Sequence, residues 1–184
     1  MKKVIVCLAD GFEEIEAVGI IDILRRAELQ VTTVSIRQGR EVTGAHGIKV
    51  MADVLFGEAD FSGYDLLVLP GGMPGAANLR EHKGLREKIV EFDRKGKMLG
   101  AICAAPMVFG SLGLLGGRSA TCYPGFGDKL GDAQVSTDPV VEDGNFITGR
   151  GPGLVFRFAL KLVEKMCGKE KAGQIAGQLL LESW

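Results

Sequence analysis

The chain has 184 residues, of which 46% are hydrophobic and 24% are charged, and its formal net charge is −1. This length and balance fit one globular domain, 1–184, with a substantial core. Because the basic residues are scattered, neither a nucleic acid nor an anionic membrane surface is expected as a partner, and no segment approaches the ~18 apolar residues of a membrane span.

The first half of the chain alternates between expected strands and helices. Lys3–Leu8 is a continuous apolar run, as in a strand covered on both faces. Acidic residues follow this run at once, which does not fit a signal peptide, so a cytoplasmic location is expected. The next elements expected are a helix over Glu13–Ala27, a strand over Gln30–Ile36, a hairpin over Glu41–Met51 that turns at Gly44–Gly47, and a buried strand over Asp65–Leu69.

The second half continues the alternation. It predicts a helix over Leu85–Arg94, a strand over Met98–Ile102, a helix over Ala104–Leu112, short strands around Ser119–Cys122, Val135–Ser136, Val140–Val141 and Phe146–Thr148, and helices near Gly153–Met166 and Lys169–Leu181. Such alternation indicates an α/β fold, a mostly parallel sheet with helices on both faces. Ligands of such sheets bind beyond the carboxyl ends of the strands, which draws attention to Asp10–Glu16, Pro70–Gly75, Cys103–Pro106 and Gly149–Gly153.

Cys103 stands where a buried strand meets the start of a helix. An elbow of this kind exposes a side chain at the sheet edge. The unpaired N–H groups and positive dipole end of the helix favour a thiolate, so we predict a thiol pKa below that of free cysteine. The alternative is a buried, inert cysteine.

Three glutamates follow the first strand. Glu13 and Glu14 are expected to be solvent-exposed and to complement the helix dipole. Glu16 lies close in sequence to Ile15 and Val18 and can turn inward. Desolvation and a neighbouring thiolate would raise its pKa, so that it stays protonated and donates a hydrogen bond to sulfur. The alternative for Glu16 is the same solvated role as its neighbours.

The glycines of Pro70–Gly75 permit close approach of the backbone to a ligand. The N–H of Gly72, with that of Ala104, would form an oxyanion hole near Cys103. An ordinary glycine turn is the alternative. The chain has no G-x-G-x-x-G spacing and no P-loop, so a nucleotide cofactor is not expected.

The four cysteines contain no CxxC pair, and only two histidines are present, so no structural metal is expected. Cys7 and Cys167 are expected to be structural, whereas Cys122 is nearer the predicted site. His82 lies in a polar stretch and is expected at the surface. His46 lies at the hairpin tip, either exposed or reaching a second subunit.

Four separated motifs resemble the ThiJ/PfpI family of glutamine-amidotransferase-like domains, and its parkinsonism-associated deglycase branch (YajL/ThiJ-like) in particular. They are Gly11–Glu16, Leu69–Gly72, Ala101–Pro106 and Arg150–Gly153. The resemblance implies a flavodoxin-like three-layer sandwich and a homodimer; no cofactor or metal is expected. It also implies that Cys103 is an oxidation-sensitive nucleophile, Glu16 its protonated partner, and Gly72 and Ala104 the oxyanion donors.

The activity that the resemblance implies is a cysteine-dependent glyoxalase or deglycase. Its substrates would be methylglyoxal or the early protein or nucleotide adducts of methylglyoxal, and its role protection against oxidative and carbonyl stress. A redox sensor or chaperone that works through oxidation of Cys103 is the alternative. A cysteine peptidase or amidase is the third reading, disfavoured because Ala104 replaces the histidine of the peptidase-like branch.

Three further residues are expected to line a pocket near Cys103: His46, Tyr123 and Pro152. His46 stands where some members of the family have an arginine that reaches across the dimer. Tyr123 stands where some have a histidine near the cysteine. These departures predict a pH response different from that of other members.

Overall fold

A computed structural model describes residues 2–182 of the chain. Its centre is a seven-stranded sheet in the order β10-β11-β7-β6-β1-β2-β5, in which every neighbouring pair is parallel except β10 and β11. The strands are β1 (Lys3–Leu8), β2 (Gln30–Ser35), β5 (Val54–Leu55), β6 (Leu66–Leu69), β7 (Met98–Ile102), β10 (Val140–Asp143) and β11 (Phe146–Gly149).

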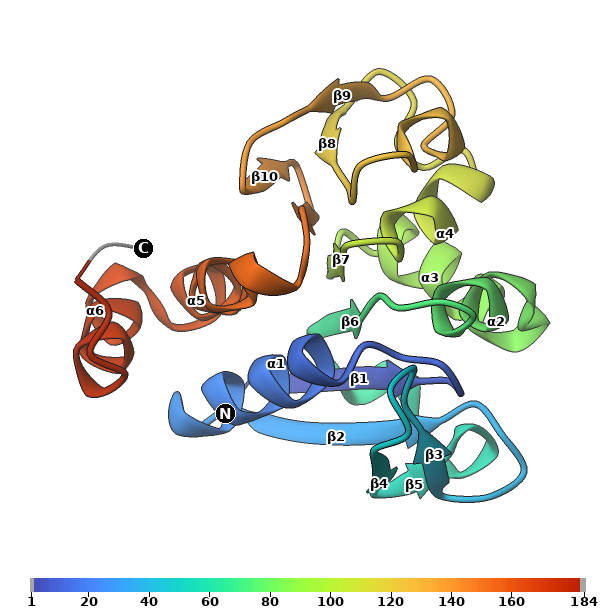
Figure 1. Cartoon of the computed structure of the whole chain (residues 1–184), viewed down its shortest axis with the longest axis horizontal. Coiled ribbons are helices and arrows are strands. Elements are labelled where there is room, and N and C mark those ends of the chain that lie inside the picture. The colour runs from blue at the N-terminus through green and yellow to red at the C-terminus, as the bar shows by residue number, and fades with distance from the viewer. Residues whose placement is uncertain (1, 183–184) are drawn as a thin grey trace.

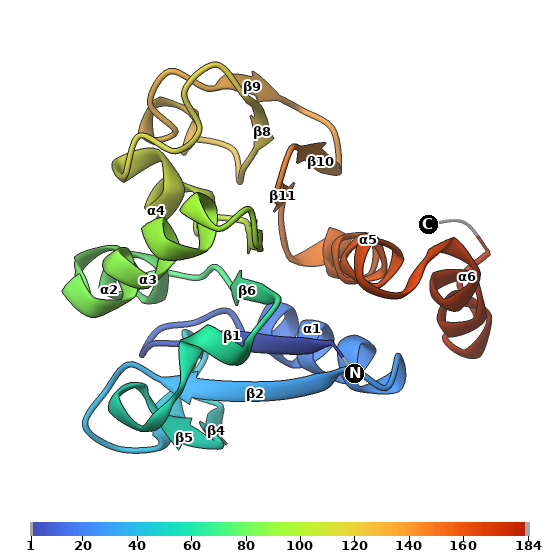
Figure 2. The ribbon, with the colours of Figure 1, turned by 180° about the vertical axis from the view of Figure 1, so that it is seen from behind.

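Helices cover both faces of this sheet. One side holds α1 (Glu14–Arg26), α5 (Val155–Cys167) and α6 (Lys169–Gln178), and the other holds α2 (Gly75–Glu81), α3 (Lys83–Arg94) and α4 (Pro106–Ser111). Figures 1 and 2 show the two helical layers with the sheet between them. The expected three-layer, flavodoxin-like α/β sandwich is therefore confirmed.

The apolar pattern of the sequence explains the layering. Val4–Leu8 of β1 are buried, as required of a strand with helices on both faces. Helix α3 buries Leu85, Ile89 and Phe92, which recur at helical spacing, and turns its charged residues outward. Gly168, at φ 93°, separates α5 from α6 because this backbone conformation favours glycine.

Two small sheets lie outside the main one. The expected hairpin is present as β3 (Glu41–Thr43) and β4 (Lys49–Met51). A parallel pair, β8 (Ser119–Thr121) and β9 (Gln134–Ser136), forms the second. The hairpin packs against the loop after β1, because Gly11 N–H donates to Thr43 O at 2.8 Å.

Some elements differ from those expected. Strand β5 and helix α2 were not predicted, since β5 has only two residues and α2 begins with glycine and alanine and lacks a strong apolar period. Helix α4 begins at Pro106, two residues later than expected, because proline suits the first helical position. Within residues 2–182, no helix combines the length and apolarity needed to cross a membrane.

Candidate functional site

Cys103 follows β7 directly and occupies a sharp elbow. Its φ is 63°, in the left-handed region that non-glycine residues rarely adopt. Two backbone hydrogen bonds hold it there: Cys103 N–H donates to Gly149 O at 2.9 Å, and Tyr123 N–H donates to Cys103 O at 2.8 Å. The strained backbone is thus fixed from both sides, and the sulfur is directed to the carboxyl edge of the sheet.

Glu16 reaches this sulfur from the first turn of α1. Its side chain is fully buried, and its Oε2 accepts a hydrogen bond from Gly71 N–H at 2.8 Å. Glu13 caps the same helix by accepting from Glu16 N–H at 2.7 Å. The inward orientation predicted for Glu16 is what the structure has.

Gly71 is the spacer between the two side chains. A Cβ at this position would lie 2.7 Å from the Cβ of Cys103 and 2.8 Å from Glu16 Oε2. The sequence predicted that the glycines here let the backbone approach a ligand closely. At Gly71 the groups that the backbone approaches are the side chains of Cys103 and Glu16.

The two groups change each other's acidity. Burial raises the pKa of Glu16 to about 7, although the Gly71 N–H and the Cys103 thiol lower it. Burial, then the charge of Glu16 and its hydrogen bond, raises the pKa of Cys103 to about 12. Among the described residues, no group lies in hydrogen-bond geometry with the buried Glu16 Oε1. The nearby Cys103 thiol nevertheless lowers the pKa of this carboxyl group.

The predicted lowering of the Cys103 thiol pKa is therefore wrong: the pKa is raised. Cys103 is only 8% exposed and its sulfur faces a carboxyl group, and both conditions oppose a second negative charge. The short α4 starts three residues after Cys103, too late for its first turn to favour the thiolate. Near pH 7 the pair loses one proton, and Glu16 is the base that can accept the thiol proton when a reaction needs it.

Two backbone N–H groups, those of Gly72 and Ala104, lie close enough to the Cys103 sulfur to oppose the rise of its pKa. Gly72 has φ 88°, and a Cβ there would collide with the backbone of Glu13. Only glycine can therefore bring this N–H so close to the start of α1.

Glu13 and Glu14 are buried, which corrects their predicted exposure. Glu14 accepts from His46 N–H at 2.6 Å and pairs with His46 Nδ1 at 2.8 Å, so the hairpin tip closes over it. Burial opposes ionisation of Glu14, but these bonds keep its pKa below the ordinary value. The hydrogen bond to Glu14 raises the pKa of His46.

The ligand atoms of Glu13, Glu14 and His46 lie within 4.8 Å of one another. Among residues 2–182 they form the one group of such side chains with metal-binding spacing. Their oxygens and Nδ1 already bind one another or backbone N–H groups. The internal hydrogen bonds account for this cluster.

A cavity of 380 Å³ lies beside the elbow. Tyr123 and Pro152, both predicted as pocket residues, line it together with Arg150. His46 is not among its lining residues and lies instead on Glu14. Tyr123 connects the cavity to the cysteine through its backbone bond to Cys103.

The remaining cysteines and His82 have distinct surroundings. Cys7 is fully buried in β1, and burial raises the pKa of its thiol. Cys122 is buried, but Cys167, expected to be structural, is exposed. His82 caps α3 by accepting from Leu85 N–H at 3.0 Å.

Gly149 is a site residue whose role the sequence did not reveal. Its carbonyl accepts the Cys103 N–H, and a Cβ there would lie 2.9 Å from both Ile102 and Phe158. Its place at the end of an apolar strand was the available signal, but the contact depends on strand order.

Comparison with known proteins identifies the family of the chain. The model of the DJ-1/PfpI family matches residues 2–165. The chain belongs to the DJ-1/PfpI family. DJ-1 homolog B of Arabidopsis thaliana is 43% identical over 182 residues, covering 98% of this chain and 42% of the plant protein. The chain thus spans less than half the length of that relative.

Two further relatives cover this chain and match most of their own length. A Pyrococcus abyssi protein named a deglycase is 34% identical over 168 residues, covering 88% of this chain and 98% of that protein. The solved structure of oxidized Toxoplasma gondii DJ-1 has a TM-score of 0.96 at 38% identity and covers 100% of both chains. These matches establish the family and the fold of the chain. One of the relatives, the Pyrococcus abyssi protein, carries the name of an enzyme.

Proposed function

We propose that this protein is a cysteine-dependent glyoxalase or deglycase that acts on methylglyoxal or on its early protein or nucleotide adducts. The observation that carries the proposal is the buried Cys103–Glu16 pair, one proton short near neutral pH, beneath two backbone N–H groups. A nucleophile with an adjacent base and oxyanion donors suits addition to a carbonyl group. The deglycase name of the Pyrococcus abyssi relative agrees with this chemistry.

The first step is addition. The Cys103 sulfur bonds to the aldehyde carbon while its proton passes to Glu16. The carbonyl oxygen becomes an oxyanion, stabilised by the N–H groups of Gly72 and Ala104, and then takes the proton from Glu16. The product is a neutral hemithioacetal with Glu16 again ionised.

The second step is isomerisation and release. Glu16 removes the proton from the former aldehyde carbon and returns it to the adjacent carbon, while the hydroxyl proton of the first carbon passes to the ketone oxygen, which converts the hemithioacetal into a lactoyl thioester. Water hydrolyses the thioester to lactate and the free thiol, so methylglyoxal and one water give lactate and one proton. In a glycated amine the Cys103 sulfur would instead displace the nitrogen from the carbinolamine carbon: the C–N bond breaks, the amine leaves with the thiol proton passed on by Glu16, and the same hemithioacetal remains.

The surroundings of the pair support a small substrate. Cys103 is 8% exposed, which suits a three-carbon dicarbonyl better than a folded chain. The cavity beside it, lined by Tyr123, Arg150 and Pro152, is open enough for the bulkier part of an adduct. Neither histidine supports a peptidase, since His46 binds Glu14 and His82 caps α3.

The test is lactate formation from methylglyoxal by the purified chain without added glutathione. Wild type should form lactate, Cys103→Ala should form none above background, and Cys167→Ser, altered at a remote cysteine, should match wild type. Equal lactate formation by wild type and Cys103→Ala would reject the proposal.

A redox sensor, with or without chaperone activity, is the second candidate. The same N–H groups and Glu16 would stabilise an oxidised Cys103 sulfur, and the similar Toxoplasma gondii structure is described as oxidized. Selective oxidation of Cys103 to sulfinate by peroxide, measured by mass spectrometry in a protein without lactate formation, would favour it.

A homodimer is proposed on a separate observation. Ile15 and Val18 lie one turn apart on α1 and are 60% and 49% exposed. Ile48, also exposed, lies near the start of α1, because its N–H donates to Glu14 Oε1, and Phe156 is exposed on the neighbouring α5. An apolar face of this kind suits a second copy of the chain.

Light scattering tests the dimer. Wild type should have twice the mass of one chain, and the double variant Ile15→Asp, Val18→Asp should have the mass of one. Val135→Asp, at an exposed apolar residue of β9, is the control and should stay dimeric. A wild type with the mass of one chain would exclude this interface.

A further inference from the structure

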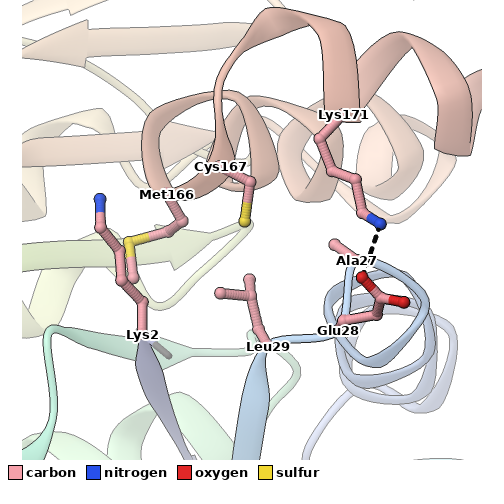
Figure 3. Close-up of a pocket in the computed structure, with 7 residues that line it drawn as sticks. All are labelled: Lys2, Ala27, Glu28, Leu29, Met166, Cys167 and Lys171. Carbon is pink, nitrogen blue, oxygen red and sulfur yellow. Dashed lines mark hydrogen bonds and ion pairs between the residues drawn. The ribbon is translucent and has the colours of Figure 1, made fainter.

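A second cavity, of 390 Å³, opens at the amino ends of β1 and β2. Strands β2, β1, β6 and β7 are parallel neighbours in the main sheet, so this end of the sheet is opposite the end that carries Cys103. Its apolar surface comes from Ala27, Leu29 and Met166. Figure 3 shows that these residues and the polar groups around them come from both chain halves.

Three kinds of reactive or charged group surround this apolar surface. Figure 3 shows the Cys167 sulfur directed toward the space above Leu29, with Lys2 on one side and Lys171 on the other. Lys171 pairs with Glu28 at 2.9 Å. Lys2 forms no ion pair with another residue of the range 2–182. One thiol, two ammonium groups and one carboxylate thus share a single cavity.

We propose that this cavity is a covalent modification site, in which Cys167 forms a mixed disulfide with a small peptide-like thiol that carries carboxylate groups. The ammonium groups of Lys2 and Lys171 would bind the carboxylates, and Glu28 an amino group of the modifier. The apolar surface would contact its carbon chain. The volume falls in the range of small-ligand sites.

The reaction is a thiol–disulfide exchange. The Cys167 thiolate attacks one sulfur of the symmetrical disulfide of the modifier, the original S–S bond breaks, and a new bond forms to Cys167. The second half of the modifier leaves as a thiolate and takes up the proton that Cys167 lost. The disulfide is itself the oxidant, so no other reagent is consumed.

The surroundings of Cys167 set the rate of this exchange. Burial raises the pKa of its thiol, while Lys2 and Lys171 lower it and Glu28 raises it. The reaction should therefore accelerate with pH and depend on the two ammonium groups. Cys7, Cys103 and Cys122 are buried, so Cys167 is the cysteine open to a disulfide reagent.

The experiment uses the Cys103→Ala variant of the full chain, so its result does not depend on the proposed enzyme function. Glutathione disulfide, which is anionic, and cystamine, which is cationic, present the same S–S bond with opposite charge. Intact mass and peptide mass spectrometry measure the rate of modification at Cys167. Glutathione disulfide should react faster than cystamine, and the preference should weaken as salt is added.

Charge variants then locate the recognition. Lys2→Glu and Lys171→Glu should each lower the ratio of the two rates about threefold to tenfold. Lys169→Glu, an exposed lysine of α6 that does not line the cavity, is the charge-matched control and should leave the ratio nearly unchanged. Cys167→Ser should take up neither reagent.

Either of two results would overturn the proposal. The first is equal reactivity of Cys167 with the two reagents, which would make it merely an exposed thiol. The second is a fall of the ratio in Lys169→Glu as large as in Lys171→Glu, which would assign the preference to overall charge. Neither result depends on whether Cys103 forms lactate from methylglyoxal, so the two proposals fail independently.

Discussion

Cys103 and Cys167 lie at opposite ends of one sheet, and their surroundings oppose each other in almost every respect. Cys103 sits on a strained elbow, is nearly buried, and faces a carboxyl group and two backbone N–H groups. Cys167 ends a helix, is exposed, and faces two ammonium groups across an open cavity. The thiol of Cys103 is thus coupled to an internal acid, whereas the thiol of Cys167 is coupled to the solvent.

The difference teaches what controls reactivity in this fold. Burial raises the pKa of both thiols. At Cys103, Glu16 provides a base within reach, so the proton can leave during a reaction even though no resident thiolate exists. The carboxylate that shares the Cys167 cavity, Glu28, is paired with Lys171, so solution pH and the nearby cations decide the rate at Cys167.

Removing the base should produce the largest effect on this contrast. Glu16→Gln keeps the size of the side chain but deprives Cys103 of its proton acceptor. We expect kcat/KM for methylglyoxal to fall roughly 10² to 10⁴-fold, the usual contribution of a positioned acid–base group. Glu170→Gln, an exposed residue of α6, is the matched control and should retain wild-type kcat/KM. Full activity in Glu16→Gln would contradict the role given to Glu16.

Disturbing the spacer should have the next largest effect. Gly71→Ala places a Cβ 2.7 Å from the Cβ of Cys103 and 2.8 Å from Glu16 Oε2, so the pair must separate. We expect a loss of about 10²-fold in kcat/KM and of about 1–3 kcal/mol in unfolding free energy. Gly39→Ala, where an added Cβ meets nothing within 4 Å, should change neither quantity. Comparable losses in both variants would show that the spacing at Gly71 is not special.

The raised pKa of Glu16 also predicts a pH dependence of stability. In the folded chain the pKa is about 7, whereas its ordinary value is 4.5, so the folded state favours the protonated carboxyl. The stabilising contribution is complete below pH 4.5 and is lost as the pH rises through 7. Wild type should lose about 3 kcal/mol of unfolding free energy over this interval relative to Glu16→Gln.

Denaturant unfolding at several pH values, with both proteins measured side by side, checks this expectation. The difference between them matters, because other carboxyl groups titrate over the same range. Parallel curves for the two proteins would mean that Glu16 has an ordinary pKa in the folded chain.

Much of the fold could be predicted from the sequence because buried parallel strands have a simple signature. Lys3–Leu8 and Met98–Ile102 were predicted with the bounds that the structure has. The rule that ligands bind beyond the carboxyl ends of strands then brought Cys103 and Gly72 together. The sequence therefore predicted that Cys103 and Gly72 lie at the same edge of the sheet.

The ionisation states were not predictable in the same way. The helix expected next to Cys103 suggested a thiolate, but α4 begins only at Pro106 and the sulfur is buried beside Glu16. Glu14 was expected to be exposed, yet the hairpin tip with His46 covers it. Both errors come from contacts between segments far apart in the sequence, to which local pattern gives no access.

The most direct test of the Cys103–Glu16 pair is the rate of alkylation of Cys103 by iodoacetamide as a function of pH. In wild type the rate should rise through a pKa near 7 and then stay level into alkaline solution. The pair loses its first proton there, and the ionised Glu16 can then accept the thiol proton during alkylation. In Glu16→Gln the rise should move to a pH above that of a free thiol, about 8.5. If the alkylation rate rose with the pKa of free cysteine in both proteins, the account would be contradicted.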